Sequence, residues 1–332
     1  MGNVNVLLGS ILASFILPQC EETSSWVHRK TKIERERIIH GIPVDRDVYP
    51  FVVSITLFDS ITGKYELLGT GSIVAADKVL TACQCVGKAV GDKVEFHLPH
   101  WVTVSAGVLK LFDSDSTTKQ ETVGKSISPH PACKSLLTND TQYDCASIVL
   151  KHPFKINDHV KPAEWFSFSY DHLKAQLDAL TDQKSICRVP GWGSTMDEEY
   201  EPSVRLLETQ VRLVPPESCK TAFCNFDHYL CNHTFNKDTQ VCTMPYLSAP
   251  CRGDQGSPLV CDGFVFGIMS WNAGCRPKYP TLFVHPAVLL QMILYKPEGT
   301  NKSRERKSNA NVVKPIKLLS DYNDHSTDVL DG

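Results

Sequence analysis

The sequence predicts an all-β protein, a sandwich or a barrel. Two observations support that prediction: the composition of the apolar stretches and the turn residues that bound them. Short apolar stretches rich in β-branched and aromatic residues recur along the middle of the chain, and Gly, Pro, Asp and Asn bound them. Such stretches are typical of strands, and many short strands at this spacing indicate an antiparallel sandwich or barrel. One further apolar stretch, at the C-terminal end of this region, favours a helix.

The expected elements follow one another along the chain. Strands are expected over FVVSITLF (51–58), KVEFHLPHWVTVSAG (93–107), ASIVLKH (146–152), VRLLETQVRLV (204–214) and GFVFGIMSW (263–271). A helix is expected over HPAVLLQMILY (285–295), where Pro286 stands early enough to be tolerated.

The two ends of the chain differ in texture from the middle. Residues 1–20 contain an apolar stretch after a short polar start, which is typical of a secretory signal peptide. A buried N-terminal helix is the alternative interpretation. Residues 21–37 are polar and charged and are interpreted as a pro-segment. Residues 297–332 are interpreted as a disordered polar tail, because they hold too little apolar surface to offset the entropy of ordering.

Composition argues against several classes of protein. The formal net charge of the 332 residues is -3, whereas a nucleic-acid-binding protein would normally carry a basic surface. No apolar run of about 18 residues exists outside the first twenty, so no membrane span is expected in the mature chain. We therefore expect neither nucleic acid nor a membrane among the partners.

Thirteen cysteines indicate a disulfide framework formed in an oxidising, extracellular compartment. Zinc sites are normally built from paired C-x-x-C units, which the sequence lacks, and CQC at 83–85 is too tight for such a site. No metal and no cofactor are therefore expected. Three N-glycosylation motifs, at Asn139, Asn232 and Asn301, fit the same compartment.

Long motifs in a fixed order resemble the trypsin/chymotrypsin family of serine proteases. They are RIIHGIPVDRDVYPFVVSI (37–55), GTGSIVAADKVLTACQC (69–85), YDCASIVLKHPFKINDHVKP (143–162), CRVPGWG (187–193) and CRGDQGSPLVCDGFVFGIMSWNAGC (251–275). The resemblance implies a peptidase-like domain over residues 38–296. It also implies the family's fold, two packed six-stranded antiparallel β-barrels with a short C-terminal helix.

The resemblance places the three catalytic positions of the family at Gln84, Asp144 and Gln255. Acyl transfer by this mechanism needs a serine, a histidine that takes its proton and a carboxylate that orients the histidine. Gln84 stands at the histidine position and Gln255 at the serine position, and only Asp144 is retained. An amide neither takes up a proton near pH 7 nor attacks a carbonyl. A pseudoprotease is therefore expected, with Gly253 and Gln255 forming only an oxyanion-like loop.

The specificity slot of the family is expected to be filled. The resemblance places its base at Ala249 and its walls, normally glycines, at Asn272 and Thr281. Side chains at the wall positions add atoms where the family keeps space open. The alternative is that shifted loops reopen the slot.

The resemblance also places an activation cleavage site between Arg37 and Ile38. After cleavage, the new ammonium at Ile38 is expected to pair with Asp254 and set the conformation of the surrounding loop. His40 stands where the family has a glycine. The alternative is a basic pro-segment that is never cleaved.

The cysteines match the family only in part. The resemblance implies the bridges Cys187–Cys261, Cys219–Cys242 and Cys251–Cys275, and a local bridge Cys224–Cys231 is expected in an enlarged loop. Gly69 stands where the usual partner of Cys85 belongs. The sequence leaves the following cysteines unassigned: Cys20, Cys83, Cys85, Cys133 and Cys145.

These features predict a secreted, catalytically inactive protease homologue that binds or regulates another protein. Such homologues resemble components of extracellular proteolytic cascades, immunity or reproductive fluids. The expected partner is a protein such as a protease, an inhibitor or a cascade component. Two alternatives stay open: a residually active serine endopeptidase, and a structural or carrier glycoprotein that uses the fold as a scaffold.

Overall fold

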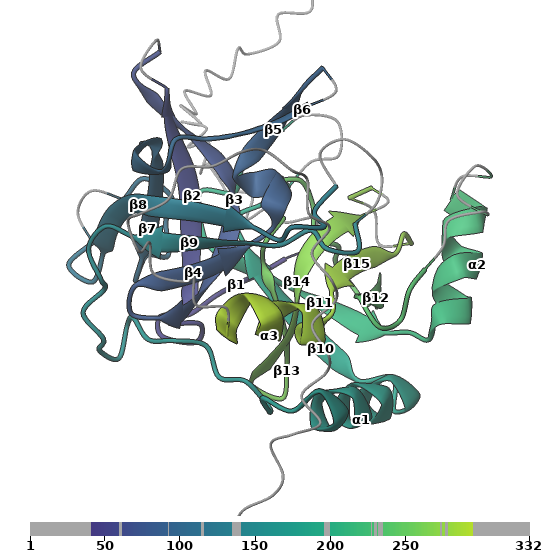
Figure 1. Cartoon of the computed structure of the whole chain (residues 1–332). Coiled ribbons are helices and arrows are strands. Elements are labelled where there is room, and N and C mark those ends of the chain that lie inside the picture. The colour runs from purple at the N-terminus through teal and green to yellow at the C-terminus, as the bar shows by residue number, and fades with distance from the viewer. Residues whose placement is uncertain are drawn as a thin grey trace, which may run out of the picture. The chain divides into compact units, whose positions relative to one another are not determined.

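Six antiparallel strands close the first barrel, drawn in purple to teal in Figure 1. The computed structural model describes residues 41–59, 62–91, 93–113, 116–134, 141–195, 200–226, 228, 231, 235–272, 274–275 and 278–294. In order around the barrel, the strands are β2 (Val52–Asp59), β3 (Lys64–Ala75), β4 (Lys78–Thr81), β9 (Ala146–Leu150), β8 (Gln120–Pro129) and β7 (Val102–Ala106).

The second barrel is closed by six further antiparallel strands. In order around it, they are β10 (Ile186–Gly191), β13 (Pro258–Cys261), β14 (Phe264–Asn272), β15 (Thr281–Val284), β12 (Gln240–Pro245) and β11 (Leu207–Leu213). A short strand, β1 (Ile42–Pro43), lies beside β11, and a separate hairpin joins β5 (Gly87–Val90) to β6 (Lys93–Phe96). The expected architecture of two six-stranded barrels is confirmed.

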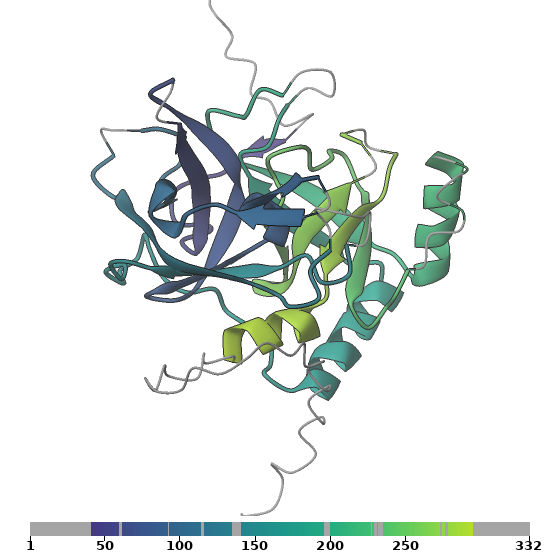
Figure 2. The ribbon, with the colours of Figure 1, turned by 45° about the horizontal axis from the view of Figure 1, so that its top comes forward.

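In the described part of the chain, three α-helices accompany the barrels. The expected C-terminal helix is present as α3 (Pro286–Leu294). Two more helices, α1 (Tyr170–Asp182) and α2 (Pro216–Phe226), lie on the side of the second barrel (Figure 2). Helix α1 buries apolar side chains at helical spacing, namely Leu173, Leu177 and Leu180.

One expected strand is divided in the structure. The stretch 93–107 forms β6, then the 3-10 helix η2 (Pro99–Trp101), then β7. Pro99 explains the break, because proline has no N–H to donate to a strand ladder and its ring fixes φ. The other four expected strands are present as β2, β9, β11 and β14, with ends shifted by a few residues.

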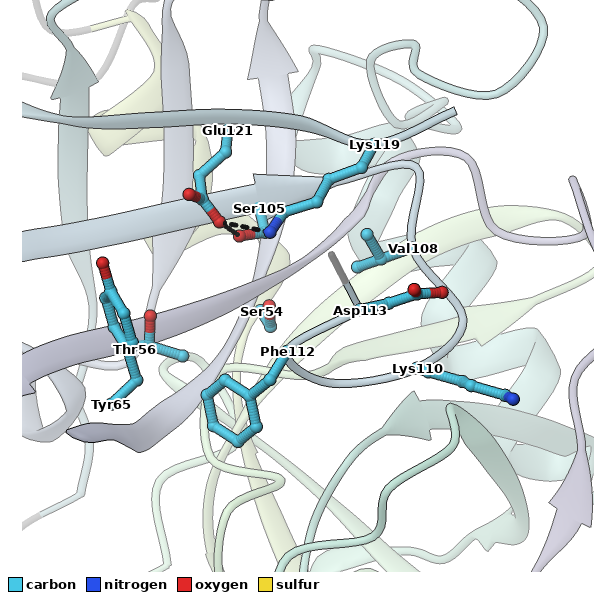
Figure 3. A pocket seen from close by; sticks show the side chains of 10 residues that line it. All are labelled: Ser54, Thr56, Tyr65, Ser105, Val108, Lys110, Phe112, Asp113, Lys119 and Glu121. Atoms are coloured by element: carbon cyan, nitrogen blue, oxygen red, sulfur yellow. Dashed lines mark hydrogen bonds and ion pairs between the residues drawn. The ribbon is translucent and has the colours of Figure 1, made fainter. Parts of the chain in front are cut away.

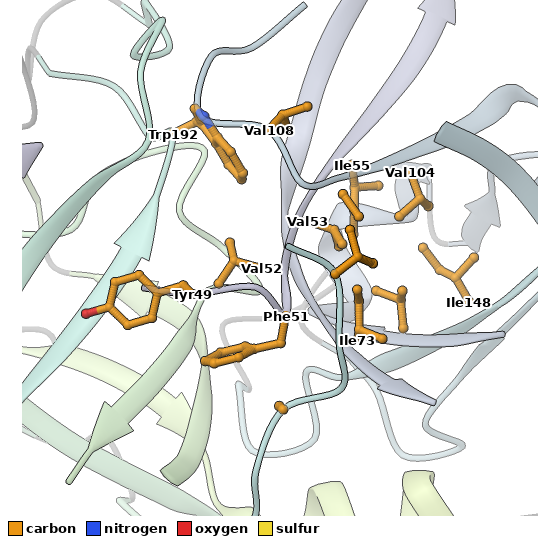
Figure 4. Close-up of a cluster of buried hydrophobic side chains, with 14 of the residues drawn as sticks. Tyr49, Phe51, Val52, Val53, Ile55, Ile73, Val104, Val108, Ile148 and Trp192 are labelled. Atoms are coloured by element: carbon orange, nitrogen blue, oxygen red, sulfur yellow. The ribbon is translucent and has the colours of Figure 1, made fainter. Parts of the chain in front are cut away.

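The apolar core continues from the first barrel to the junction with the second. Ile55, Val104 and Ile148 are buried inside the first barrel (Figure 4). Tyr49 and Phe51, just before β2, lie toward the strands of the second barrel and belong to the same cluster. This shared core fixes the barrels against each other, and side chains at the junction are therefore held firmly. Among the described residues, no helix is long and apolar enough to cross a membrane.

Candidate functional site

The first part of the site is a single helical turn that follows β4. The 3-10 helix η1 (Cys83–Cys85) begins two residues after the strand ends at Thr81. A disulfide joins Cys83 to Cys133, in the loop after β8, so this turn is covalently fixed. The turn presents Gln84 at the junction between the barrels.

The side-chain amide of Gln84 is held by both barrels. Its Nε2 donates one hydrogen bond to the carboxylate of Asp144 and another, of 2.7 Å, to the backbone carbonyl of Ser270 in β14. The backbone N–H of Gln84 donates to Asp144 Oδ1 at 3.1 Å. Both protons of the amide are therefore engaged, which fixes the orientation of the side chain.

Asp144 is fully buried just before β9. Besides Gln84, the hydroxyl of Ser270 donates to its Oδ2 at 2.6 Å. Several donors converge on this carboxylate, as a buried charge requires. The two barrels thus share one polar network of Asp144, Gln84 and Ser270.

The second part of the site is the loop from Cys251 to Ser257. Gly253 and Gly256 have φ values of +95° and +83°, which favour glycine. A Cβ at Gly256 would also lie 2.1 Å from the carbonyl oxygen of Thr70. The loop therefore keeps a tight turn pressed against β3.

The side chain of Gln255 folds back onto its own loop. Its Oε1 accepts a 2.8 Å hydrogen bond from the backbone N–H of Gly253. The resemblance assigns this N–H to the oxyanion-like loop. In the structure that donor is therefore satisfied by Gln255 itself.

Cys85 lies behind the same loop as a buried free thiol. Its Sγ contacts the backbone carbonyl of Gln255 at 3.3 Å. A Cβ built on Gly69 would lie 2.5 Å from this sulfur, so the two chain positions are adjacent. Burial, together with the nearby charge of Asp144, raises the pKa of Cys85 to about 12.

The three expected slot positions lie together in the second barrel. Ala249 and Thr281 are buried, and Thr281 is the cross-strand partner of Asn272. Asn272 Nδ2 donates a 3.1 Å hydrogen bond to the carbonyl of Pro250, the residue after Ala249. The Asn272 side chain is thus fixed toward the chain that forms the base of the slot.

Asp254 is buried beneath the loop. Its carboxylate accepts hydrogen bonds from the backbone N–H groups of Gly193 and Cys251, at 2.8 and 2.9 Å. Burial raises its pKa to about 6 against the opposing effect of these two bonds. Arg37 and Ile38, the expected cleavage site, lie outside the described residues.

The structure contains all four bridges named from the sequence. They are Cys187–Cys261, Cys219–Cys242, Cys224–Cys231 and Cys251–Cys275. Cys85 and Cys145 are free thiols, and Cys20 lies outside the described residues. The glycosylation motifs at Asn139, Asn232 and Asn301 lie outside them as well.

In two groups of side chains in the described part of the chain, the potential metal-ligand atoms lie within 4.8 Å of one another. The groups are Cys224, His228 and Cys231, and Cys83, Cys133 and Asp144. In both groups the two cysteines form a disulfide, so neither offers a thiolate ligand.

Three features of the site were missed from the sequence. The bridge Cys83–Cys133 joins residues far apart in the chain, and spacing alone gives no signal for it. The hydroxyl and carbonyl of Ser270 complete the network around Asp144. The hydroxyl of Tyr200 donates a 2.9 Å hydrogen bond to the carbonyl of Leu67. The Tyr200 side chain thereby lies next to Gly253 in the loop.

Comparison with known proteins gives this arrangement its family. The sequence model of one family, Trypsin, matches residues 38–293. The chain belongs to the trypsin family. The expected relationship to trypsin-like serine proteases is therefore confirmed.

Members of the trypsin family from rodents are similar along most of their length. Kallikrein 1-related peptidase b22 of Mus musculus is 30% identical, covering 75% of this chain and 85% of its own. Renal glandular kallikrein of Mastomys natalensis is 29% identical, covering 79% and 88%. Granzyme E of Mus musculus is 27% identical, covering 71% and 82%.

Solved structures of the trypsin family share the fold. The structure titled neuropsin, a serine protease expressed in the limbic system of mouse brain, has a TM-score of 0.59 at 22% identity. It covers 77% of this chain and 98% of its own. A second structure, titled GrC, has a TM-score of 0.60 at 21% identity and covers 77% and 97%.

Proposed function

We propose that this chain is a secreted, catalytically inactive member of the trypsin family that acts as a binding or regulatory protein. The observation that carries the proposal is the state of the two glutamines at the histidine and serine positions. Gln84 has both amide protons engaged, and Gln255 Oε1 accepts the Gly253 N–H. Neither side chain supplies a base or a nucleophile.

The second glutamine also weakens any residual catalysis. In enzymes of this kind, backbone N–H donors stabilise the developing oxyanion even when the serine and histidine are missing. Here the N–H of Gly253 is already paired with Gln255 Oε1. A substrate carbonyl would have to displace that bond before it gained one of its own.

Neighbouring nucleophiles do not replace the serine. The thiol of Cys85 is buried, and its pKa of about 12 leaves it protonated at neutral pH. Ser257 is fully buried, and its hydroxyl has no hydrogen-bond partner among the described residues, hence no base. Both observations favour an inactive protein over the alternative of a residually active endopeptidase.

The test of inactivity is labelling by a serine-reactive fluorophosphonate. The chain is cleaved after Arg37, incubated with the probe beside active trypsin, and analysed by intact-mass spectrometry. No mass increase is expected for the chain, while trypsin is labelled. Labelling at Ser257 or at any other residue of the cleaved chain would overturn the proposal.

The binding role is proposed to depend on cleavage after Arg37. The buried carboxylate of Asp254 lies beneath the loop and has a raised pKa, so a new ammonium that reached it would be stabilised. Cleaved and uncleaved chains, immobilised in parallel, are used to capture proteins from the native secretion. Equal capture by both forms would show that binding does not depend on cleavage after Arg37. Absence of specific capture by either form would favour a structural or carrier glycoprotein instead.

A further inference from the structure

The first barrel has a pocket on its outer face, and neither Gln84 nor Gln255 lines it. Its volume is about 140 Å³. Strands β2, β7 and β8 form its floor, the start of β3 forms one wall, and residues 108–113 form another. Figure 3 shows Ser105 and Glu121 on one side of this space and Tyr65 and Phe112 on the other. Nothing in the proposed function uses this pocket.

The floor of the pocket offers unused hydroxyl groups. Ser54 and Thr56 are only 3% and 4% exposed, and both line the pocket. Among the described residues, neither hydroxyl has a hydrogen-bond partner. Neither oxygen is among the buried polar atoms without a partner, so both hydroxyls open onto the pocket, where they can donate to and accept from a polar ligand.

A carboxylate stands above this floor. Glu121 accepts hydrogen bonds from Ser105 Oγ and Lys119 Nζ, both at 2.8 Å (Figure 3). Partial burial alone would raise the pKa of Glu121, but these two partners outweigh it and the pKa is lowered. Glu121 therefore stays ionised and can accept further hydrogen bonds from a ligand.

The opposite side of the pocket is aromatic. Tyr65 and Phe112 lie with ring centroids 6.4 Å apart and planes inclined by 34°, and Phe58 continues the row. Phe112 is 56% exposed as a residue. Its φ is +58°, a left-handed conformation that bulky residues rarely adopt. Strained residues of this kind are concentrated at functional sites.

The surrounding chain holds that strained conformation in place. Leu111, next to Phe112, is buried, and its N–H donates to the carbonyl of Val204 at 2.8 Å. The N–H of Leu206 donates to the carbonyl of Leu109 at 2.6 Å. The backbone that carries Phe112 is thus tied to the segment that leads into β11, so this part of the aromatic wall is preformed for binding.

Size and charge narrow the class of ligand. A cavity of roughly 150 Å³ holds a benzene molecule, so this pocket accepts a single six-membered ring. Lys110 and Lys119 are balanced by Asp113 and Glu121, which favours a neutral ligand over an anion. A phenol ring carries one hydroxyl, too few to satisfy the floor and Glu121 together.

We propose that this pocket binds one neutral pyranose unit of a glycan. The C–H face of the sugar ring lies against Tyr65 and Phe112, and its hydroxyls bond to Ser54, Thr56 and Glu121. A sugar hydroxyl both donates and accepts, so it satisfies the floor hydroxyls and the carboxylate at once. This binding is independent of the two glutamines and would persist whatever the activity of the chain.

The test is a saturation-transfer NMR titration of the full chain with methyl glycosides of glucose, galactose, mannose and N-acetylglucosamine. At least one glycoside is expected to bind. Thr56→Val, which keeps the side-chain shape and removes the hydroxyl, weakens that binding about tenfold, whereas Thr56→Ser keeps it. Phe112→Ala also weakens it. Phe168→Ala, at an aromatic side chain that is 60% exposed outside the pocket, leaves it unchanged.

Several outcomes would overturn the proposal. They are binding of none of the glycosides, binding that is insensitive to Thr56→Val, and equal loss in Thr56→Val and Thr56→Ser. Tighter binding of N-acetyltyrosine amide would assign the pocket to an aromatic side chain of a protein partner instead. Tighter binding of inorganic phosphate would show that the two lysines of the pocket outweigh its two carboxylates, so that the pocket prefers an anion to a neutral sugar. The melting temperature of each variant establishes that it is folded.

Discussion

The two glutamines of the site have different physical roles. Gln84 joins the barrels, because its amide donates to Asp144 in the first and to the carbonyl of Ser270 in the second. Gln255 acts within its own loop, where its Oε1 accepts the N–H of Gly253. Gln84 is therefore expected to matter more for stability than Gln255.

Removing the amide of Gln84 is expected to destabilise the fold. Gln84→Ala leaves the Ser270 carbonyl without this donor and withdraws one donor from Asp144, at a cost of about 1 to 3 kcal/mol. Gln84→Glu is expected to cost more at neutral pH, because it brings a second carboxylate to Asp144. Urea unfolding measures both. Equal stability of the three proteins would show that the network is not structural.

Cys85 lacks the partner cysteine that the resemblance implies, because Gly69 stands at that position, and a substitution at Gly69 is expected to supply it. A Cβ at Gly69 would lie 2.5 Å from Cys85 Sγ, so Gly69→Cys is expected to form a disulfide and remove the free thiol of Cys85. Closing a loop of about 15 residues contributes about 3 kcal/mol, and less where the site is crowded. The carbonyl of Gln255, 2.6 Å from that Cβ, supplies such crowding.

The control for that prediction is Gly69→Ala. It adds the same Cβ without a sulfur and is expected to lower the melting temperature, because the methyl meets Cys85 and Gln255. Thiol titration and thermal unfolding, with and without reductant, separate the two variants. A Gly69→Cys protein that keeps its full thiol count would contradict the prediction.

The residue types in the sequence predict the chemistry of the site, but they do not predict which groups its side chains contact. The amide at Gln84 was readable from the sequence once the surrounding motif was recognised. Its bond to the Ser270 carbonyl was not, because that contact joins segments 186 residues apart. The pairing of Gln255 with its own loop depends on a rotamer, which a linear pattern does not determine.

At the scale of elements, β-strands were predictable and two helices were not. Strands β2 and β14 are rich in β-branched and aromatic residues, a composition that indicates a strand directly. Helices α1 and α2 are polar on most of their surface, and α1 buries only one narrow apolar row. A row of three leucines is too weak a helical signal to distinguish α1 from a loop between strands.

The disulfide Cys83–Cys133 is expected to stabilise more than Cys224–Cys231. The first closes a separation of 50 residues and the second a separation of 7, and stabilisation grows with loop length. Replacing the first pair by alanine is expected to cost about 3 to 4 kcal/mol. Urea unfolding of the two double variants tests this order, and a larger loss on removing Cys224–Cys231 would contradict it.

For the whole molecule, Asp254 makes stability depend on pH. Its pKa in the folded chain is raised from 3.8 to about 6, so the folded state holds the proton more tightly than the unfolded state. The stability from this group is complete below about pH 4 and is lost as the pH rises through about 6. The loss is on the order of 2 to 3 kcal/mol.

Comparison with Asp254→Asn isolates that effect in the uncleaved chain. The variant lacks the titrating group, so its stability relative to the original chain is expected to rise between pH 4 and pH 6. His285, whose pKa burial lowers to about 4, is present in both proteins, and its opposite dependence cancels. A difference in unfolding free energy that is constant with pH would contradict this expectation.

The most direct measurement is turnover by the chain cleaved after Arg37. The cleaved chain and its Asp144→Asn variant are incubated with a complex peptide mixture, and new termini are identified by mass spectrometry. We predict that both give the same background, because any cleavage comes from a contaminant and needs no carboxylate at Asp144. Products formed by the original chain and lost in a folded Asp144→Asn variant would contradict catalytic inactivity.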